Sequence, residues 1–190
     1  MSMPHWEYFL SIESDLEACS RYVEFCKDNY NTYSIEFARI IMASCSEFDT
    51  IIKLLCKSID PQKETKNILQ YFPILSAKYP NFTNYEMYIP RYKISLKPWE
   101  QWSDSVSPEW WSKGYNKIKH ERDKNFKEAN LFNALNSVSG LLCGILYYYE
   151  ECFHGKEEIE KSNAPRLFVP YDPSPIIWGG TFWHYYIPDR

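Results

Sequence analysis

The sequence predicts a mainly α-helical protein: a bundle of four to five helices with short extended segments and an aromatic C-terminal extension. Two stretches favour long amphipathic helices, residues 34–59 and 128–153, because their apolar side chains recur every three or four positions. The length of 190 residues suits one ordinary core. We therefore expect a single helical domain over residues 1–164, followed by a proline- and aromatic-rich extension over residues 165–190.

Three helices are predicted in the N-terminal half. The first, over residues 14–27, has only a modest apolar face. The second follows Ser34, a residue type that caps helices, and ends at Asp60-Pro61. The third and shorter helix covers residues 64–78 and contains Pro73, which favours a kink.

The second half alternates extended and helical segments. Residues 79–108 carry prolines and alternating aromatic side chains, which predicts extended chain with one or two short strands. Helix resumes at Ser107-Pro108, a cap followed by proline, and continues to about Phe153 with a break near Asn125. Gly179-Gly180 lies between two strand-like runs and favours a tight hairpin in the extension.

Composition limits the functional class. A net charge of -4 argues against a protein that coats nucleic acid with its whole surface, although a local basic patch remains compatible with phosphate contacts. The six cysteines form no CxxC pair, so we expect reduced thiols in the cytoplasm, and no metal or cofactor. No signal peptide is recognisable, and polar residues and glycines interrupt the apolar stretch 131–149, which predicts a core helix and no membrane span.

A basic segment with a central histidine stands out in this acidic chain. Residues 113–127 contain six lysines and arginines against two acids. On a regular helix over residues 110–126, His120 points away from the apolar face, with Lys113 and Asn116 before it on its own side. A solvated helix face with ion pairs at i,i+4 spacing accounts for the same pattern.

The stretch "YNKIKH", followed by "EANLFNALNSVSGLLCGILYYY", resembles the HEPN superfamily of prokaryotic toxins and defence ribonucleases. The resemblance covers about residues 34–153. The family site is an arginine, a polar neighbour such as Asn, and a His four to six residues after the arginine. Asn116 and His120 match the polar neighbour and the histidine, whereas Tyr115 stands where the family has arginine, and Lys113 is the nearest cation.

The resemblance implies metal-independent cleavage of RNA, in which the ribose 2′-hydroxyl attacks the adjacent phosphate. His120 would transfer a proton, Asn116 would orient the phosphate or the imidazole, and Lys113 would balance the developing negative charge. Two copies of the helix would face each other across a homodimer axis. The other residues assigned to this site are Lys117, Lys119, Arg122 and Lys124 for substrate binding, with Glu47, Asp49 and Lys53 in support.

Two functional hypotheses follow. The first is a HEPN-like protein of a prokaryotic toxin or anti-phage system, which either cuts RNA or binds it without cutting. The second is a noncatalytic interaction subunit whose aromatic C-terminal segment contacts a protein partner and whose basic helix is only solvated. For Asp49 and Lys53, a surface ion pair at i,i+4 spacing is the alternative to a supporting role beside His120. The four central tryptophans are expected to cover the bundle, with base stacking as the alternative: Trp99, Trp102, Trp110 and Trp111.

Overall fold

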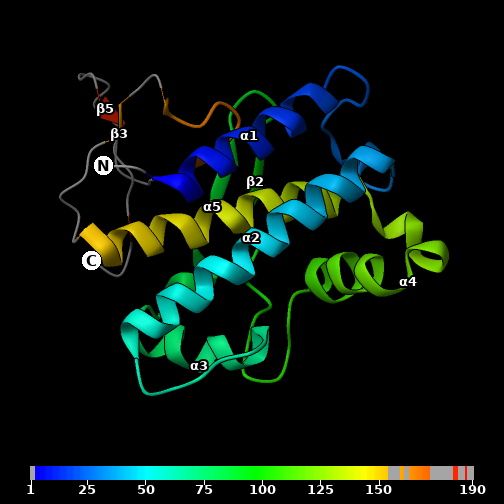
Figure 1. Cartoon of the computed structure of the whole chain (residues 1–190). Coiled ribbons are helices and arrows are strands. Elements are labelled where there is room, and N and C mark those ends of the chain that lie inside the picture. The colour runs from blue at the N-terminus through cyan, green and yellow to red at the C-terminus, as the bar shows by residue number, and fades with distance from the viewer. Residues whose placement is uncertain (1–2, 154–158, 161–162, 172–181, 184–186, 188–190) are drawn as a thin grey trace.

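The computed structural model describes residues 3–153, 159–160, 163–171, 182–183 and 187. Helices dominate these residues, and short strands form small antiparallel sheets, so the predicted mainly α fold is confirmed (Figure 1). Single 3₁₀ turns connect some of the elements: η1 at Lys27–Asn29, η2 at Phe82–Asn84 and η4 at Phe126–Glu128.

The first helix, α1, covers Pro4–Cys19, so the predicted helix over residues 14–27 was wrong at both its start and its end. Proline suits the first turn of a helix because its fixed φ matches helical geometry and its missing N–H would have no partner there. The face of α1 that meets the core carries a stripe at three- and four-residue spacing that includes the buried residues Trp6, Phe9, Ile12 and Leu16.

Helices α2, Ile35–Ile59, and α5, Leu131–Phe153, form the central pair of the bundle (Figure 1). Ser34 caps α2 as predicted, because its Oγ accepts a hydrogen bond of 3.1 Å from the backbone N–H of Phe37. The two helices approach closely at Gly144, where a Cβ would lie 2.9 Å from the ring of Phe48. The predicted packing of these two helices on each other is therefore confirmed.

Helix α5 is enclosed by the rest of the fold. It is long and apolar enough to cross a membrane, yet 89% of its most apolar window is buried inside the protein. Other elements cover it on nearly all sides, including α1, α2 and the segment before α4. It is the core helix that the sequence predicted.

The third helix, α3, covers Ile68–Lys78. It starts after Asn67, whose side chain accepts hydrogen bonds from two backbone N–H groups of the first turn, and Pro73 lies inside it. Strands β1, Met87–Ile89, and β2, Ile94–Leu96, then form an antiparallel hairpin, which confirms the predicted extended segment.

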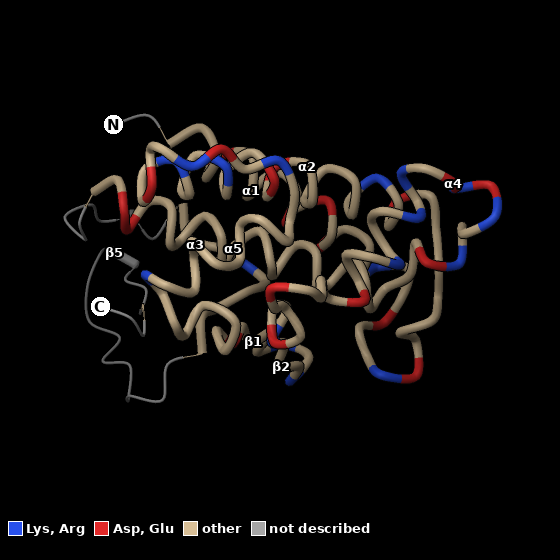
Figure 2. The backbone as a smooth tube through the Cα atoms, turned by 90° about the horizontal axis from the view of Figure 1, so that it is seen from below, with Lys and Arg blue, Asp and Glu red and all other residues tan. Residues whose placement is uncertain are grey.

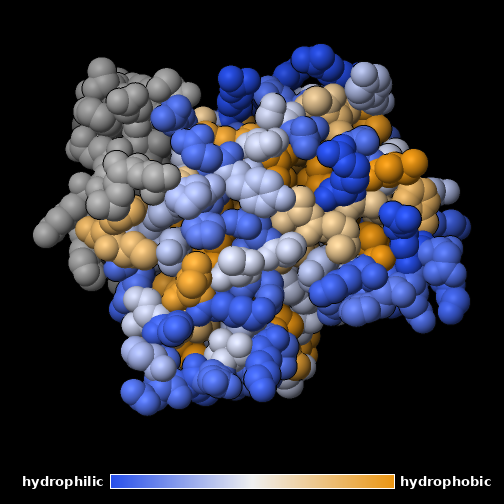
Figure 3. All heavy atoms as spheres, in the orientation of Figure 1, coloured by the Kyte–Doolittle hydropathy of each residue, from blue (hydrophilic) through white to orange (hydrophobic). Residues whose placement is uncertain are grey.

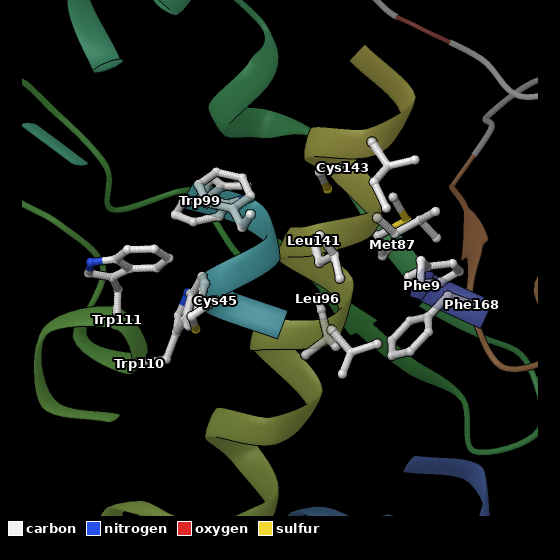
Figure 4. Close-up of a cluster of buried hydrophobic side chains, with 14 of the residues drawn as sticks. Phe9, Cys45, Met87, Leu96, Trp99, Trp110, Trp111, Leu141, Cys143 and Phe168 are labelled. Carbon is white, nitrogen blue, oxygen red and sulfur yellow. The ribbon is translucent and has the colours of Figure 1, made fainter. Parts of the chain in front are cut away.

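The four central tryptophans are buried, as expected for residues that cover the bundle. Their exposed fractions are between 0 and 4%, and the rings of Trp99 and Phe48 stack with centroids 4.2 Å apart. Three of the four indole N–H groups donate to backbone carbonyls, those of Gly140, Ile68 and Pro98. Figure 4 shows Trp99, Trp110 and Trp111 in one part of the core and Phe9 and Phe168 in another. Base stacking on these buried rings is excluded.

The described part of residues 165–190 begins with a segment that is anchored in the core. Leu167 and Phe168 are buried, and β4, Val169–Pro170, pairs antiparallel with β1. Two further short strands, β3 at Ile159–Glu160 and β5 at Phe182–Trp183, pair with each other. The predicted hairpin at Gly179-Gly180 lies outside the described residues.

Glu13 of α1 holds this segment. Its carboxylate is 2% exposed and accepts three backbone hydrogen bonds, from the N–H groups of Arg166 at 2.8 Å, Leu167 at 3.0 Å and Phe168 at 3.1 Å. Burial raises the pKa of Glu13, and the three hydrogen bonds oppose that rise. The carboxylate therefore links the first helix to a segment close to the end of the described chain.

Candidate functional site

An open groove of about 1120 Å³ lies among α1, α2 and α4. Its apolar lining comes from all three helices and includes Ile12, Ala43 and Ile118. Figure 3, in the orientation of Figure 1, shows apolar residues gathered among hydrophilic ones on the side where these helices meet. The groove is lined by His120 and by five charged side chains, those of Asp15, Arg39, Lys119, Arg122 and Asp123.

The basic segment is not one regular helix. Residues Trp110–Asn116, η3, form a π-helix, and α4 follows at Lys117–Asn125. The wider π turn buries consecutive residues, including Trp110 and Trp111. Within α4, Glu121 has non-helical dihedral angles, φ −144° and ψ 49°, so the chain bends between His120 and Arg122. Side chains before and after this bend both line the groove.

His120 lies where the sequence placed it, on the outside of its helix. It is exposed and lines the groove, and within the described chain it has no hydrogen-bond partner. Lys113 and Asn116 do not line the groove. The assumption of a regular helix was wrong here, because a π-helix advances by a smaller angle per residue and shifts Lys113 relative to His120.

Lys113 is instead paired on its own helix. Its Nζ lies 2.7 Å from the carboxylate of Glu109, and the two side chains are half exposed or more. The hydrogen bond to Glu109 raises the pKa of Lys113. The solvated-face interpretation therefore holds for this lysine.

The four predicted substrate-binding residues divide into two groups. Lys119 and Arg122 line the groove. Lys119 also lies over the ring of Tyr115, with Nζ 5.2 Å from the ring centroid. Lys117 and Lys124 do not line the groove, and Lys124 is 3.7 Å from the carboxylate of Glu121. Figure 2 shows the concentration of basic residues along α4.

The three residues assigned to support the site lie outside the groove and have other partners. Glu47 accepts a hydrogen bond of 2.5 Å at its Oε1 from Nδ1 of His5 on α1. Asp49 pairs with Lys53 at 2.5 Å and accepts a 2.7 Å hydrogen bond from the hydroxyl of Tyr71. Burial, followed by this hydrogen bond, raises the pKa of Tyr71. The surface pair of Asp49 and Lys53 is confirmed, and these residues serve helix packing.

Three charged groove residues were missed in the sequence: Asp15, Arg39 and Asp123. Arg39 projects from α2, and its Nη1 donates to Oε2 of Glu36, while its Nη2 lies 4.0 Å from Oδ2 of Asp15 on α1. The sequence contained one indication for Arg39: it is the first basic residue on the polar side of the helix predicted over residues 34–59. Only the three-dimensional packing brings it to the groove that contains His120.

The described residues contain no group of three His, Cys, Asp or Glu side chains able to hold a metal ion. The chemistry that the groove offers is therefore that of an imidazole, cations and carboxylates above an apolar floor. Comparison with known proteins gives no match: no family model fits the chain, and no curated protein or solved structure is significantly similar to it.

Proposed function

We propose that the protein is a cytoplasmic, HEPN-like RNA-binding protein of a prokaryotic toxin or anti-phage defence system. The observation that carries the proposal is the convergence of His120, Arg122 and Lys119 of α4 with Arg39 of α2 on one groove. The chain has a net charge of -4, so most of the surface outside the groove repels RNA. RNA is therefore directed to the place where the cations gather.

The size and lining of the groove suit a polymer segment. Its volume of about 1120 Å³ exceeds that of common small-molecule sites, roughly 300–1,000 Å³. Tyr8 of α1 is 45% exposed at this groove, and Phe126 lines it beyond α4. Aromatic faces beside cations are the usual combination for single-stranded nucleic acid, because bases stack while the cations contact phosphate.

One chain supplies three walls of the groove. The sequence-based hypothesis required a second copy of the basic helix, because a single helix cannot surround a phosphate. In the structure α1 and α2 of the same chain face α4 across the groove. Homodimerisation thus stays a prediction, and RNA binding by a monomer is compatible with this arrangement.

A noncatalytic protein-interaction function has one specific observation in its favour. Ile35, at the start of α2, is 67% exposed and lines the groove, and the floor beneath it is apolar. An amphipathic helix of a partner would cover such a surface. This alternative predicts binding that is insensitive to the charge of Arg122.

Binding of a labelled single-stranded RNA, measured by fluorescence anisotropy at two salt concentrations, tests the proposal. Loss of one charge-assisted contact in Arg122→Gln should weaken binding about 5- to 10-fold and reduce the salt dependence by about 0.7 per lost phosphate contact. Arg91→Gln is the matched control, because Arg91 lies over the ring of Tyr92 and outside the groove. No binding by the wild type, or equal affinity of the two variants, refutes the proposal.

Cleavage is assayed on the same RNA in the presence of a chelator. If the wild type produces 2′,3′-cyclic phosphate ends and His120→Ala does not, the protein is a metal-independent endoribonuclease with His120 as the proton-transfer group. Cleavage that is unchanged in His120→Ala would remove this residue from the mechanism. RNA binding without any cleavage would identify a binding protein that lacks the family's catalytic step.

A further inference from the structure

The position that should carry arginine in the HEPN motif cannot serve the groove in this chain. Tyr115 is 6% exposed, and its ring packs against Trp111 with centroids 4.9 Å apart. A charged side chain at this buried position would carry a large desolvation cost. An arginine that contacts phosphate in this groove therefore comes from another position, and Arg39 of α2 faces Arg122 of α4 as a second candidate.

We propose that Arg39 of α2 is the phosphate-gripping arginine of the groove and that Asp15 and Glu36 restrain it when no RNA is bound. This inference rests on the proposed RNA-binding function. Arg39 lines the same groove as His120, although α2 and α4 are far apart in the sequence. Arginine suits this task better than lysine, since its planar guanidinium donates two parallel hydrogen bonds to phosphate oxygens.

The guanidinium of Arg39 is divided between two carboxylates. Nη1 donates to Glu36 on its own helix, and Nη2 is 4.0 Å from Asp15 on α1. The Arg39 side chain is 62% exposed, and those of Asp15 and Glu36 are 55% and 53% exposed. Ion pairs with this exposure are weak, so a phosphate that accepts two parallel hydrogen bonds from the guanidinium can displace them.

Asp15 acts on RNA in two ways. Its Oδ2 lies within ion-pair distance of Nη2 of Arg39, at 4.0 Å, and it places a negative charge in the groove itself. Asp123 also lines the groove but has no ion pair with Arg39 within the described residues. Replacement of Asp123 only removes a negative charge from the groove, whereas replacement of Asp15 also releases Arg39. A comparison of the two variants therefore separates these two effects on RNA binding.

The experiment measures the affinity for a single-stranded RNA in a double-mutant cycle. Arg39→Gln should weaken binding about tenfold, the usual effect of one charge-assisted contact, and Arg39→Lys should recover only part of this loss. Asp15→Asn should strengthen binding about 2- to 5-fold, the range that corresponds to one exposed ion pair. In the Arg39→Gln background this gain should shrink, because no guanidinium is left to release.

Asp123→Asn is the matched control, with circular dichroism of every variant as the check on folding. Its gain in affinity should be the same with Arg39 or Gln at position 39. The inference is overturned if Arg39→Gln binds like the wild type, or if the two aspartate variants behave alike in both backgrounds. In those cases weakened binding by Arg122→Gln still supports the proposed function, whereas a complete absence of RNA binding in the wild type overturns both.

Discussion

Replacement of Glu13 by alanine should detach the segment around residues 166–168 from α1. The variant removes the acceptor of three backbone N–H groups, two of which belong to Leu167 and Phe168, with exposed fractions of 3% and 0%. A buried N–H without a partner costs about 1–3 kcal/mol, which sets an upper limit of several kcal/mol for the three.

Two effects reduce this limit. A cavity of about 140 Å³ lies beside Glu13 and gives room for water to replace part of the carboxylate. The variant also removes the cost of burying a charge. We therefore expect the free energy of unfolding to fall by about 3 kcal/mol, which lowers the melting temperature by about 6–12 °C in a domain of this size.

Thermal unfolding followed by circular dichroism gives the global effect, and hydrogen exchange of amides 166–168 gives the local one. Glu17→Ala is the matched control on the same helix, because Glu17 is partly exposed and its carboxylate lies 4.0 Å from the Arg166 side chain. That variant should cost no more than about 1 kcal/mol. If Glu13→Ala and Glu17→Ala have the same melting temperature, or if the three amides stay protected from exchange in Glu13→Ala, then Glu13 does not anchor this segment.

Three further predictions concern the core. Burial raises the pKa of Glu13 above its ordinary value of 4.5. The stability that the protein gains from protonation of Glu13 is therefore complete below pH 4.5 and is lost as pH rises through the folded-state pKa. The unfolding free energy of the wild type, relative to that of Glu13→Gln, should fall accordingly between about pH 4 and 7. Gly144→Ala should lower the unfolding free energy by about 1–3 kcal/mol, as judged by urea denaturation, because the ring of Phe48 must move; an unchanged midpoint contradicts this. Iodoacetamide should alkylate the exposed Cys152 well before Cys45, whose burial raises its thiol pKa, and equal labelling rates by mass spectrometry would contradict the packing.

The long helix α2 was predictable because every local signal agrees. Ser34 caps it, apolar residues follow at three- and four-residue steps, and Asp60-Pro61 ends it. The start of α1 was missed although Pro4 is a typical first-turn residue. Its stripe is interrupted by the buried Glu13, whose hydrogen-bond partners lie more than 150 residues later in the chain. No local pattern reveals that pairing.

The candidate site was predictable only in part. The outward position of His120 follows from helix periodicity, and the basic composition of its segment is visible in the sequence. The π-helix before it and the bend at Glu121 are not, since both depart from the periodicity on which the prediction depends. Arg39 was missed because its relation to His120 arises from the packing of α4 beside α1 and α2.

The link between Glu13 and residues 166–168 has a consequence for the order of folding during synthesis. The first helix leaves the ribosome with a carboxylate whose three partners, 153 to 155 residues further along, have not yet been translated. Until they emerge, the Glu13 carboxylate is without these three partners, although the apolar stripe of α1 can already meet α2 and α5. Strand β1 can pair with β2 at once, but its other edge has no partner until β4 is translated. The hydrogen bonds that join α1 to the C-terminal segment therefore form late in synthesis, and in a chain stalled before residue 166 Glu13 would lack all three of these donors.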